Sequence, residues 1–297
     1  MTKRCVPMNT IMEVQNISKQ YKAKKVLDNI SFSIYSEEIV ALVGKNGSGK
    51  STLLKIIGGI VDCDFGEVNK NVPSLKIGYV PEVAPSHVFF TPEEYLFHMG
   101  KISGIPKKTL HQKINDLLIL FNMQEARAIR MNYFSKGMKQ KIMIMQAMLA
   151  DTQLLILDEP LSGLDPRAQQ DLENTLLSLK ENGYSIILTC HETKLLENLV
   201  DRVLLIQAGH VIHMASEPII QSNQLVFELP NQKSFDEFLP LIQIKQIRTL
   251  SKGNQELTVT VSKADTDKIL FALLQSEASI KQLIPVNPKK EQFHTHF

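Results

Sequence analysis

A glycine-rich segment, GKNGSGKST, occupies residues 44–52, directly after the apolar run IVALV and directly before LLKII. It fits the pattern G-x-x-x-x-G-K-[ST], whose glycines let successive backbone N–H groups converge on phosphate oxygens. The positive N-terminal end of a following helix favours the same anion. A glycine-rich turn that binds nothing would not need a strand before it and a helix after it. The segment therefore predicts a nucleotide site.

The side chains of this segment suit different parts of a nucleotide. Lys50 can neutralise the β- and γ-phosphates, and the hydroxyl of Ser51 can bind Mg²⁺. The residues expected to contact the nucleotide are Gly44, Lys45, Asn46, Gly47, Ser48, Gly49, Lys50, Ser51 and Thr52.

Two carboxylates, Asp158 and Glu159, follow another apolar run, LLIL, at residues 154–157. In open parallel sheets, ligands collect at the edge formed by the carboxyl ends of the strands. Asp158 suits Mg²⁺, which keeps several waters and takes few protein carboxylates. Glu159 can reach the attacking water as a general base. Asp-Glu-Pro alone is also compatible with a strand that ends in a polar turn, but beside a phosphate site it predicts nucleotide hydrolysis.

Alternating strands and helices, as in α/β proteins, must position these groups. Residues 11–17 (IMEVQNI) and 30–34 (ISFSI) alternate as half-buried antiparallel strands do. The runs 39–43 and 154–157 are continuously apolar, like central parallel strands, and two further runs are apolar over most of their length: 185–189 and 202–206. The sequence thus predicts an α/β fold with a mixed β-sheet core that has an antiparallel part.

Residues 92–150 are predicted to be mostly helical. In LHQKINDLLILF, five apolar residues fall on one stripe at helical spacing: Leu110, Ile114, Leu117, Leu118 and Phe121. We expect a helical subdomain at about 83–150, inserted into a larger domain that spans 10–222.

The composition changes after ASEPIIQSN (215–223), where a proline and polar residues predict a linker. The order that follows is strand, helix, strand, strand, helix, strand: 225–229, 234–241, 244–250, 256–261, 265–275 and 279–284. This order predicts a small α+β accessory domain at 223–297 of the ferredoxin-like βαββαβ type. Asp265 and Asp267 are expected to cap the start of its last helix rather than bind a metal.

Composition excludes several classes of function. Lys and Arg number 33 against 31 Asp and Glu, so the net charge of +2 gives no reason to expect nucleic acid. Three widely spaced cysteines, Cys5, Cys63 and Cys190, indicate reduced thiols in a cytosolic protein. No apolar run is long enough for a secretory signal, and none approaches the roughly 20 residues that span a bilayer. Any role at a membrane is therefore expected to need a partner.

Taken together, these segments resemble the nucleotide-binding subunit of ABC transporters, from residue 10 to about 220. GKNGSGKST resembles the Walker A loop of that family, and LLILDEP resembles Walker B with its catalytic glutamate. The resemblance implies a P-loop NTPase fold of ABC type, with ATP and Mg²⁺ as cofactors. It also makes Glu159 and Lys50 the central catalytic residues.

Further family elements follow in the expected order. Tyr21 is similar to the aromatic residue that stacks on adenine. SGLDP (162–166) resembles the D-loop, which implies that Asp165 makes a contact across a dimer. CHE (190–192) resembles the segment of the switch histidine, which implies that His191 contacts the γ-phosphate.

The family signature commonly reads LSGGQ, and residues 134–138, FSKGM, occupy its place. Ser135 and Gly137 keep the hydroxyl and the backbone N–H that can face a γ-phosphate, whereas Lys136 and Met138 depart from the pattern. Lys136 either faces phosphate or lies in solvent. The methionines 138, 143, 145 and 148 are expected to pack in a helix core.

In this family two subunits dimerise head to tail, so the resemblance implies that the signature acts on the nucleotide of a partner. The sequence leaves open whether that partner is identical. Glu82, in IGYVPE (77–82), stands where most members have glutamine. A carboxylate there can accept a hydrogen bond from water or ligate Mg²⁺. These two departures from the family pattern, the signature FSKGM and Glu82, resemble the drug- and peptide-export branch typified by bacitracin and daunorubicin exporters.

The leading hypothesis is an ATPase subunit at the cytoplasmic face of the membrane that drives a separate permease, docked near residues 89–94. A buried loop anchor would explain Phe89 and Phe90 equally well. One alternative is a soluble ABC ATPase that acts on ribosomes or DNA, which the single Walker A and the near-neutral charge disfavour. Another is a regulatory module that hydrolyses ATP poorly. Dimer contacts or regulation are the expected roles of the C-terminal domain.

Overall fold

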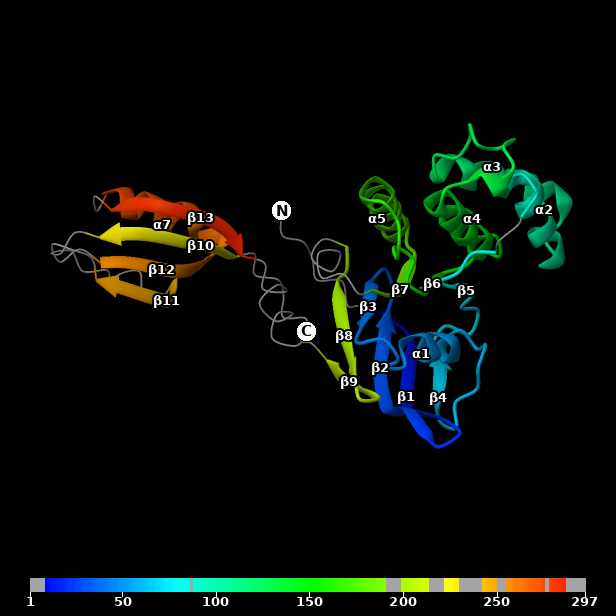
Figure 1. Ribbon diagram of the computed structural model, residues 1–297, viewed down its shortest axis with the longest axis horizontal. Coiled ribbons are helices and arrows are strands. Elements are labelled where there is room, and N and C mark those ends of the chain that lie inside the picture. Colours follow the sequence, from blue (N-terminus) through cyan, green and yellow to red (C-terminus); the bar gives the residue numbers. More distant parts are fainter. Residues whose placement is uncertain are drawn as a thin grey trace. The chain divides into compact units, whose positions relative to one another are not determined.

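The computed structural model (Figure 1) describes residues 9–85, 88–190, 199–213, 222–229, 242–249, 255–275 and 278–286. The chain divides into two compact units, Met1–Ala215 and Ser216–Phe297. This division lies inside the segment 215–223 that the sequence marked as a linker.

A six-stranded sheet in the order β5-β6-β7-β3-β8-β9 forms the centre of the first unit. Neighbouring strands run parallel from β5 to β8, and β9 is antiparallel to β8. Every residue of β3, β6 and β7 is buried, as their apolar sequences predicted. The strands are β3 (Ile39–Val43), β5 (Ile77–Val80), β6 (Leu154–Leu157), β7 (Ser185–Thr189), β8 (Arg202–Gln207) and β9 (His210–His213).

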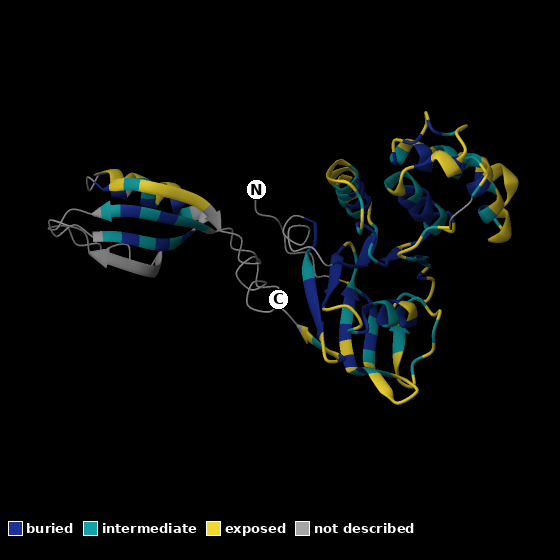
Figure 2. Cartoon of the chain, viewed as in Figure 1, coloured by how far each residue is buried: buried dark blue, intermediate teal, exposed yellow. Residues whose placement is uncertain are grey.

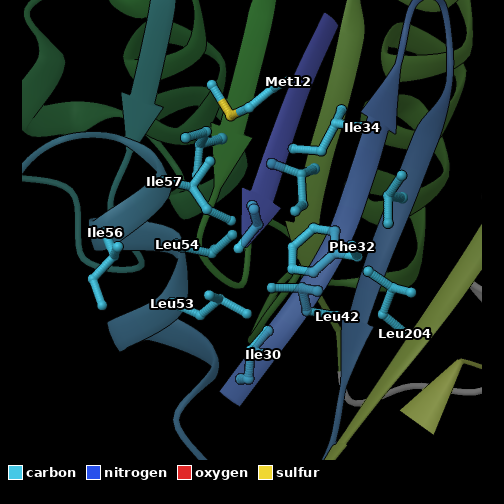
Figure 3. Packing of buried hydrophobic residues seen from close by; sticks show 14 of the residues in the cluster. Met12, Ile30, Phe32, Ile34, Leu42, Leu53, Leu54, Ile56, Ile57 and Leu204 are labelled. Carbon is cyan, nitrogen blue, oxygen red and sulfur yellow. The ribbon is translucent and has the colours of Figure 1, made fainter. Parts of the chain in front are cut away.

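A second, antiparallel sheet in the order β2-β1-β4 faces this core. Its strands are β1 (Thr10–Tyr21), β2 (Lys24–Tyr35) and β4 (Phe65–Lys70). Apolar side chains of both sheets pack around the helix α1 (Lys50–Ile57), whose Leu53, Leu54 and Ile57 are buried in the same cluster (Figure 3). Burial of this one cluster therefore fixes α1, and with it the segment that leads into α1, against the central sheet.

The register of the parallel strands brings their carboxyl ends to one edge. Val80 of β5 is paired with Leu157 of β6, Leu157 with Leu188 of β7, and Thr189 with Leu42 of β3. The segments that follow β3, β5 and β6, together with the last residue of β7, consequently lie along the same edge, which is where the sequence predicted a site.

Helices predominate between β5 and β6, in the region predicted to form a helical subdomain. This region contains α2 (Pro92–Ile102), α3 (Lys107–Leu120), a 3₁₀ turn (Met131–Tyr133) and α4 (Lys136–Met148), and α5 (Pro166–Glu181) follows β6. Short polar side chains define where three of these helices begin, because each accepts a bond from an otherwise unpaired N–H. Thr91 does so for α2 in a capping box with Glu94, Ser135 for α4, and Asp165 for α5. Three of the four methionines of α4, at 143, 145 and 148, are buried, as predicted.

The second unit holds a four-stranded antiparallel sheet in the order β11-β12-β10-β13. Its elements are β10 (Ser222–Leu229), β11 (Ile242–Thr249), β12 (Gln255–Ser262), α7 (Lys263–Gln275) and β13 (Ser279–Val286). Buried and half-buried residues alternate along β10 and β12 (Figure 2), and the buried ones pack against Ile269 and Leu273 of α7.

Two details of the C-terminal prediction change. Because α7 begins at Lys263, Asp265 lies within its first turn and Asp267 is exposed further along, so neither flanks the start of the helix. A carboxylate in the first turn still interacts favourably with the helix dipole. The helix predicted at 234–241 lies outside the described residues.

Packing of the first unit can be tested with two isoleucines of opposite exposure. Ile30 is fully buried in the cluster around α1, whereas Ile60 is 55% exposed. Ile30→Ala should lower the free energy of unfolding by about 2–5 kcal/mol, since it removes buried methyl groups and leaves a cavity. Ile60→Ala should change it by less than about 0.5 kcal/mol. Chemical denaturation measures both, and equal losses would contradict the packing described above.

Candidate functional site

The phosphate loop, residues 44–52, connects β3 to α1 at the carboxyl edge of the central sheet. Two of its glycines are required by the backbone around them. A Cβ built on Gly44 would lie 2.4 Å from the carbonyl oxygen of Ile206. Gly49, the N-cap of α1, has φ +105°, and a Cβ there would lie 2.7 Å from Leu27. Any side chain at either position would displace the loop, so these glycines set the path of its backbone.

Lys50 is the buried cation of this loop, with 4% of its surface exposed. Its ammonium donates hydrogen bonds to the carbonyl oxygens of Gly44 (2.7 Å) and Lys45 (3.1 Å). Burial lowers the pKa of Lys50, and the charges of Glu159 and Asp158 oppose that shift. The ammonium is thus bound by its own loop beside the position that phosphates would take, and it carries the positive charge that they need.

The carboxylate of Asp158 is buried and is surrounded by hydroxyl groups. Ser51 Oγ donates to Asp158 Oδ1 at 3.0 Å, Thr189 Oγ1 donates to the same oxygen at 2.9 Å, and Tyr79 OH donates to Oδ2 at 3.4 Å. Burial and the adjacent Asp158 charge raise the pKa of Tyr79 far above its ordinary value, so this phenol remains a proton donor. The structure therefore brings together Ser51 and Asp158, the two residues that the sequence assigned to Mg²⁺.

Glu159 has a left-handed backbone, with φ +48°. For a residue other than glycine this conformation costs of order 1–3 kcal/mol and persists only where its surroundings enforce it. Its N–H donates to Thr189 Oγ1 at 2.6 Å, which is one such constraint. Unlike Asp158, Glu159 is only partly buried, so its carboxylate can meet water.

Thr189 and Tyr79 are site residues that no sequence motif marks. Thr189 bonds both Asp158 and the backbone of Glu159, and so holds the two acidic residues in one arrangement. The available signal was its position as the last residue of the apolar run SIILT, at the carboxyl end of a central strand. Tyr79 lies inside β5, and only the pairing of β5 with β6 brings it to Asp158.

Tyr21 and Glu82, which the sequence also assigned to the site, are exposed to solvent. Tyr21, at the end of β1, is 46% exposed, and the ammonium of Lys19 lies 5.6 Å from the centre of its ring. Glu82 is exposed, two residues after the end of β5. His191 lies outside the described residues.

The signature segment, residues 134–138, begins α4. Ser135 is its N-cap, and Ser135 Oγ accepts a bond from the N–H of Met138 at 3.2 Å. Asp165 is the N-cap of α5 and accepts from the N–H groups of Arg167 (3.1 Å) and Ala168 (2.9 Å). Both predicted cross-dimer residues are thus exposed side chains at helix N-termini, where an anion is favoured.

A buried parallel strand, a phosphate loop, a helix, and an Asp–Ser pair at the neighbouring strand end define a nucleotide-binding protein of the P-loop class. A family model described as ABC transporter matches residues 27–162. The chain is 33% identical over 234 residues to an ABC transporter ATP-binding protein of Methanocaldococcus jannaschii, covering 78% of this chain and 88% of that one. It therefore belongs to the family of ABC transporter ATP-binding subunits.

Two further similarities extend this result. The linearmycin resistance ATP-binding protein LnrL of Bacillus subtilis is 28% identical over 277 residues, which cover 89% of each chain. A solved structure of the ATP-binding subunit of an ABC transporter matches with a TM-score of 0.60 at 33% identity, over 68% of this chain and 88% of that one. The protein is thus an ATPase subunit of a family whose members pair with membrane permeases. Among the described residues, no helix is long and apolar enough to cross a membrane.

The hydroxyl of Thr189 offers a test of this arrangement. Thr189→Val keeps the shape of the side chain but removes the hydroxyl that accepts from the N–H of Glu159 and donates to Asp158. Since an unsatisfied buried group costs about 1–3 kcal/mol, kcat for ATP hydrolysis should fall roughly 10- to 100-fold. Thr189→Ser should stay within about threefold of the parent, because it retains the hydroxyl.

Thr152→Val is the matched control, since Thr152 is also buried but its hydroxyl donates to the carbonyl oxygen of Ala147 before β6 begins. Its kcat should stay near that of the parent. A kcat for Thr189→Val equal to that of Thr152→Val would show that the bridge has no part in turnover.

Proposed function

We propose that this chain is the ATPase subunit of an exporter of peptides, drugs or other amphipathic compounds, acting as a dimer on a separate permease. The observation that carries the proposal is the buried network of Ser51, Asp158 and Thr189 beside the phosphate loop. Export is supported by the similarity to the linearmycin resistance protein, which extends over 89% of each chain. It is also supported by the export-type signature and by Glu82.

In the proposed reaction, the N–H groups of residues 44–52 and the ammonium of Lys50 bind the phosphates, and Tyr21 stacks on adenine. Glu159 takes a proton from water while the water oxygen attacks the γ-phosphorus and the bond to the β–γ bridging oxygen breaks. Glu82 and His191 are the further residues proposed to orient the water and the γ-phosphate. Because Lys50 already has two carbonyl partners, it must exchange them for phosphate oxygens when ATP binds.

The donor set around Asp158 fits Mg²⁺. Ser51 Oγ and Asp158 Oδ1 lie 3.0 Å apart and offer hydroxyl and carboxylate oxygens, the ligands that this hard cation prefers. Ser51 would bind the ion directly, Asp158 would hold it through water, and Glu82 is a further proposed ligand. When bound, Mg²⁺ neutralises charge on the phosphate oxygens.

The signature is proposed to act across a dimer. Ser135 and Asp165 are both exposed at helix N-termini, so a second subunit could place its nucleotide against them. The signature residues assigned to this contact are Ser135, Lys136, Gly137 and Met138. The mass of the intact complex would distinguish a second copy of this chain from a related subunit.

An exposed aromatic pair is the proposed docking point for a cytoplasmic helix of the permease. Phe89 is 65% exposed, which argues against a buried loop anchor, and Phe90 is 46% exposed. The carbonyl oxygen of Phe90 accepts a hydrogen bond from Met131 N–H at 2.9 Å, and the Phe90 ring lies 5.1 Å from that of His98. The pair is thus presented on a fixed backbone, at the junction of the core and the helical subdomain. A permease docked here would associate this subunit with the cytoplasmic face of the membrane.

Phe89→Ala should weaken binding to the co-encoded permease by about tenfold, since exposed aromatic anchors supply much of the binding energy at interfaces. Phe65→Ala is the control, because Phe65 is 74% exposed on β4, outside the helical subdomain. Titration of each variant against the permease in detergent or nanodiscs measures the affinities. If both variants bind like the parent, the docking point lies elsewhere.

For the second unit we propose the complete βαββαβ topology, with its first helix in residues 234–241. The observed strand order β11-β12-β10-β13, antiparallel throughout, is the order that this topology produces. The proposed domain boundaries are 10–222 and 223–297, and a contact between the C-terminal domains of two subunits is the proposed role.

Glu159→Gln tests the function as a whole. The variant should lose at least about 100-fold in kcat, because it lacks the proposed base, while it still binds ATP and forms a more stable ATP-dependent dimer. Steady-state hydrolysis with the permease present, together with light scattering, measures both properties. Equal and slow hydrolysis by parent and variant would favour a regulatory module over a transport ATPase. Binding of the parent to ribosomes or DNA at physiological salt would favour the soluble alternative.

A further inference from the structure

The N-terminal half of α4 approaches α5 and the turn before it at three residue pairs. A Cβ built on Gly163, in the turn before α5, would lie 2.9 Å from Lys136 Nζ. A Cβ built on Gly137 would lie 3.0 Å from the Cβ of Ala168. One turn further along, Lys141 Nζ lies 2.6 Å from Asp171 Oδ2. Residue numbers rise together in the three pairs, so the N-terminal ends of α4 and α5 lie side by side.

The middle pair sets the separation of the two helices. Gly137 lies within α4, without a positive φ, so its backbone conformation is open to any residue. What the position lacks is space, because 3.0 Å between two Cβ atoms is closer than ordinary van der Waals contact. A methyl group at 137 would push α4 away from α5.

The third pair, Lys141 and Asp171, also connects α4 and α5 to the end of α3. Lys141 is 7% exposed, and its ammonium also donates to the carbonyl oxygen of Phe121 at 2.9 Å. Phe121 is the C-cap of α3, where the helix dipole favours a cation. A buried cation is stable only if it is paired, so Lys141 binds α4 to Asp171 on α5 and to the end of α3 at once.

These contacts begin one or two residues after Ser135, the N-cap of α4, and close to Asp165, the N-cap of α5. We infer that the pairs 137–168 and 141–171 join the signature and the D-loop of one chain into a single rigid unit, in which Gly137 is a positioning residue that acts through Ala168. The inference rests on the proposed function, since the unit matters only if both N-caps meet the same nucleotide of a second subunit. It also accounts for the sequence at this point, where lysine replaces the first signature glycine but the second is kept.

Two substitutions test the inference: one adds a methyl group at 137, and the other removes the opposing methyl group at 168. Gly137→Ala should lower kcat by about tenfold or more, because overpacking displaces Ser135 relative to Asp165, and should leave the KM for ATP within about twofold. Adding Ala168→Gly removes the opposing methyl group and should return kcat to within about threefold of the parent. Ala168→Gly alone should be close to the parent. Gln170→Gly, on the exposed face of the same turn of α5, places a glycine in the same helix without making space and should not rescue.

The double variant Gly137→Ala/Ala168→Gly decides between two roles of Gly137. If it is as slow as Gly137→Ala, the alanine obstructs the nucleotide itself and the positioning role is overturned. No loss of kcat in Gly137→Ala would overturn it as well. These outcomes differ from failure of the proposed function, in which the parent chain with its permease would show no hydrolysis that depends on Glu159.

Should Gly137→Ala fail to fold, as judged by circular dichroism, the ion pair supplies an independent test. Lys141→Met should lower kcat without changing ATP affinity, and Lys141→Arg should retain most of it. Asp171→Asn should add little further loss in the Lys141→Met background, because the partner is already absent. Full additivity of the two losses would show that Lys141 and Asp171 act separately, which would overturn the inference.

Discussion

Asp158 is a charged group inside the fold, and three hydroxyl groups from separate segments surround it: Ser51 on α1, Tyr79 on β5 and Thr189 on β7. A buried carboxylate without such partners would be strongly destabilising, so its partners must be correctly placed whenever the chain is folded. The same requirement aligns the phosphate loop, the second acidic residue and the strand ends with one another. Stability of the core and geometry of the site therefore depend on one set of hydrogen bonds.

The parallel register makes this arrangement possible. Pairing of Val80, Leu157 and Leu188 on neighbouring strands places groups far apart in the chain within reach of a single carboxylate. The apolar cluster between the two sheets holds α1 in place. This keeps Ser51 Oγ within hydrogen-bonding distance of Asp158. Glu159 adopts a left-handed backbone, and its hydrogen bond to Thr189 offsets part of that cost. The residue to which the hydrolytic role is assigned is thus held in a strained backbone conformation.

The helical subdomain is linked to the core in a different way. Its contacts with α5 are a close approach of small residues, Gly137 and Ala168, and an ion pair between the buried Lys141 and the exposed Asp171. Such contacts have strict geometry, since neither a larger side chain nor an unpaired charge is tolerated there. They connect the start of α4 to the start of α5 and leave the exposed aromatic pair of Phe89 and Phe90 at the surface. The subdomain is accordingly held against α5 by these contacts and also packs on β5, where a Cβ built on Gly78 would lie 2.6 Å from the carbonyl oxygen of Ala147.

Several features followed from the sequence because they depend on local chemistry. The phosphate loop needs glycines and a lysine at fixed spacing, a buried central strand must be apolar throughout, and helices begin at residues such as Ser135 and Asp165 that can cap them. These rules identified the α/β class, the loop and both acidic residues. Tyr79 and Thr189 were not identified, because nothing in their immediate sequence distinguishes them from other strand residues. Their part depends on which strands become neighbours, and pairing between distant segments is decided by the packing of the whole sheet. The short distance between Gly137 and Ala168 is likewise decided by the tertiary structure. A glycine is needed at 137 only because folding packs Ala168 against it.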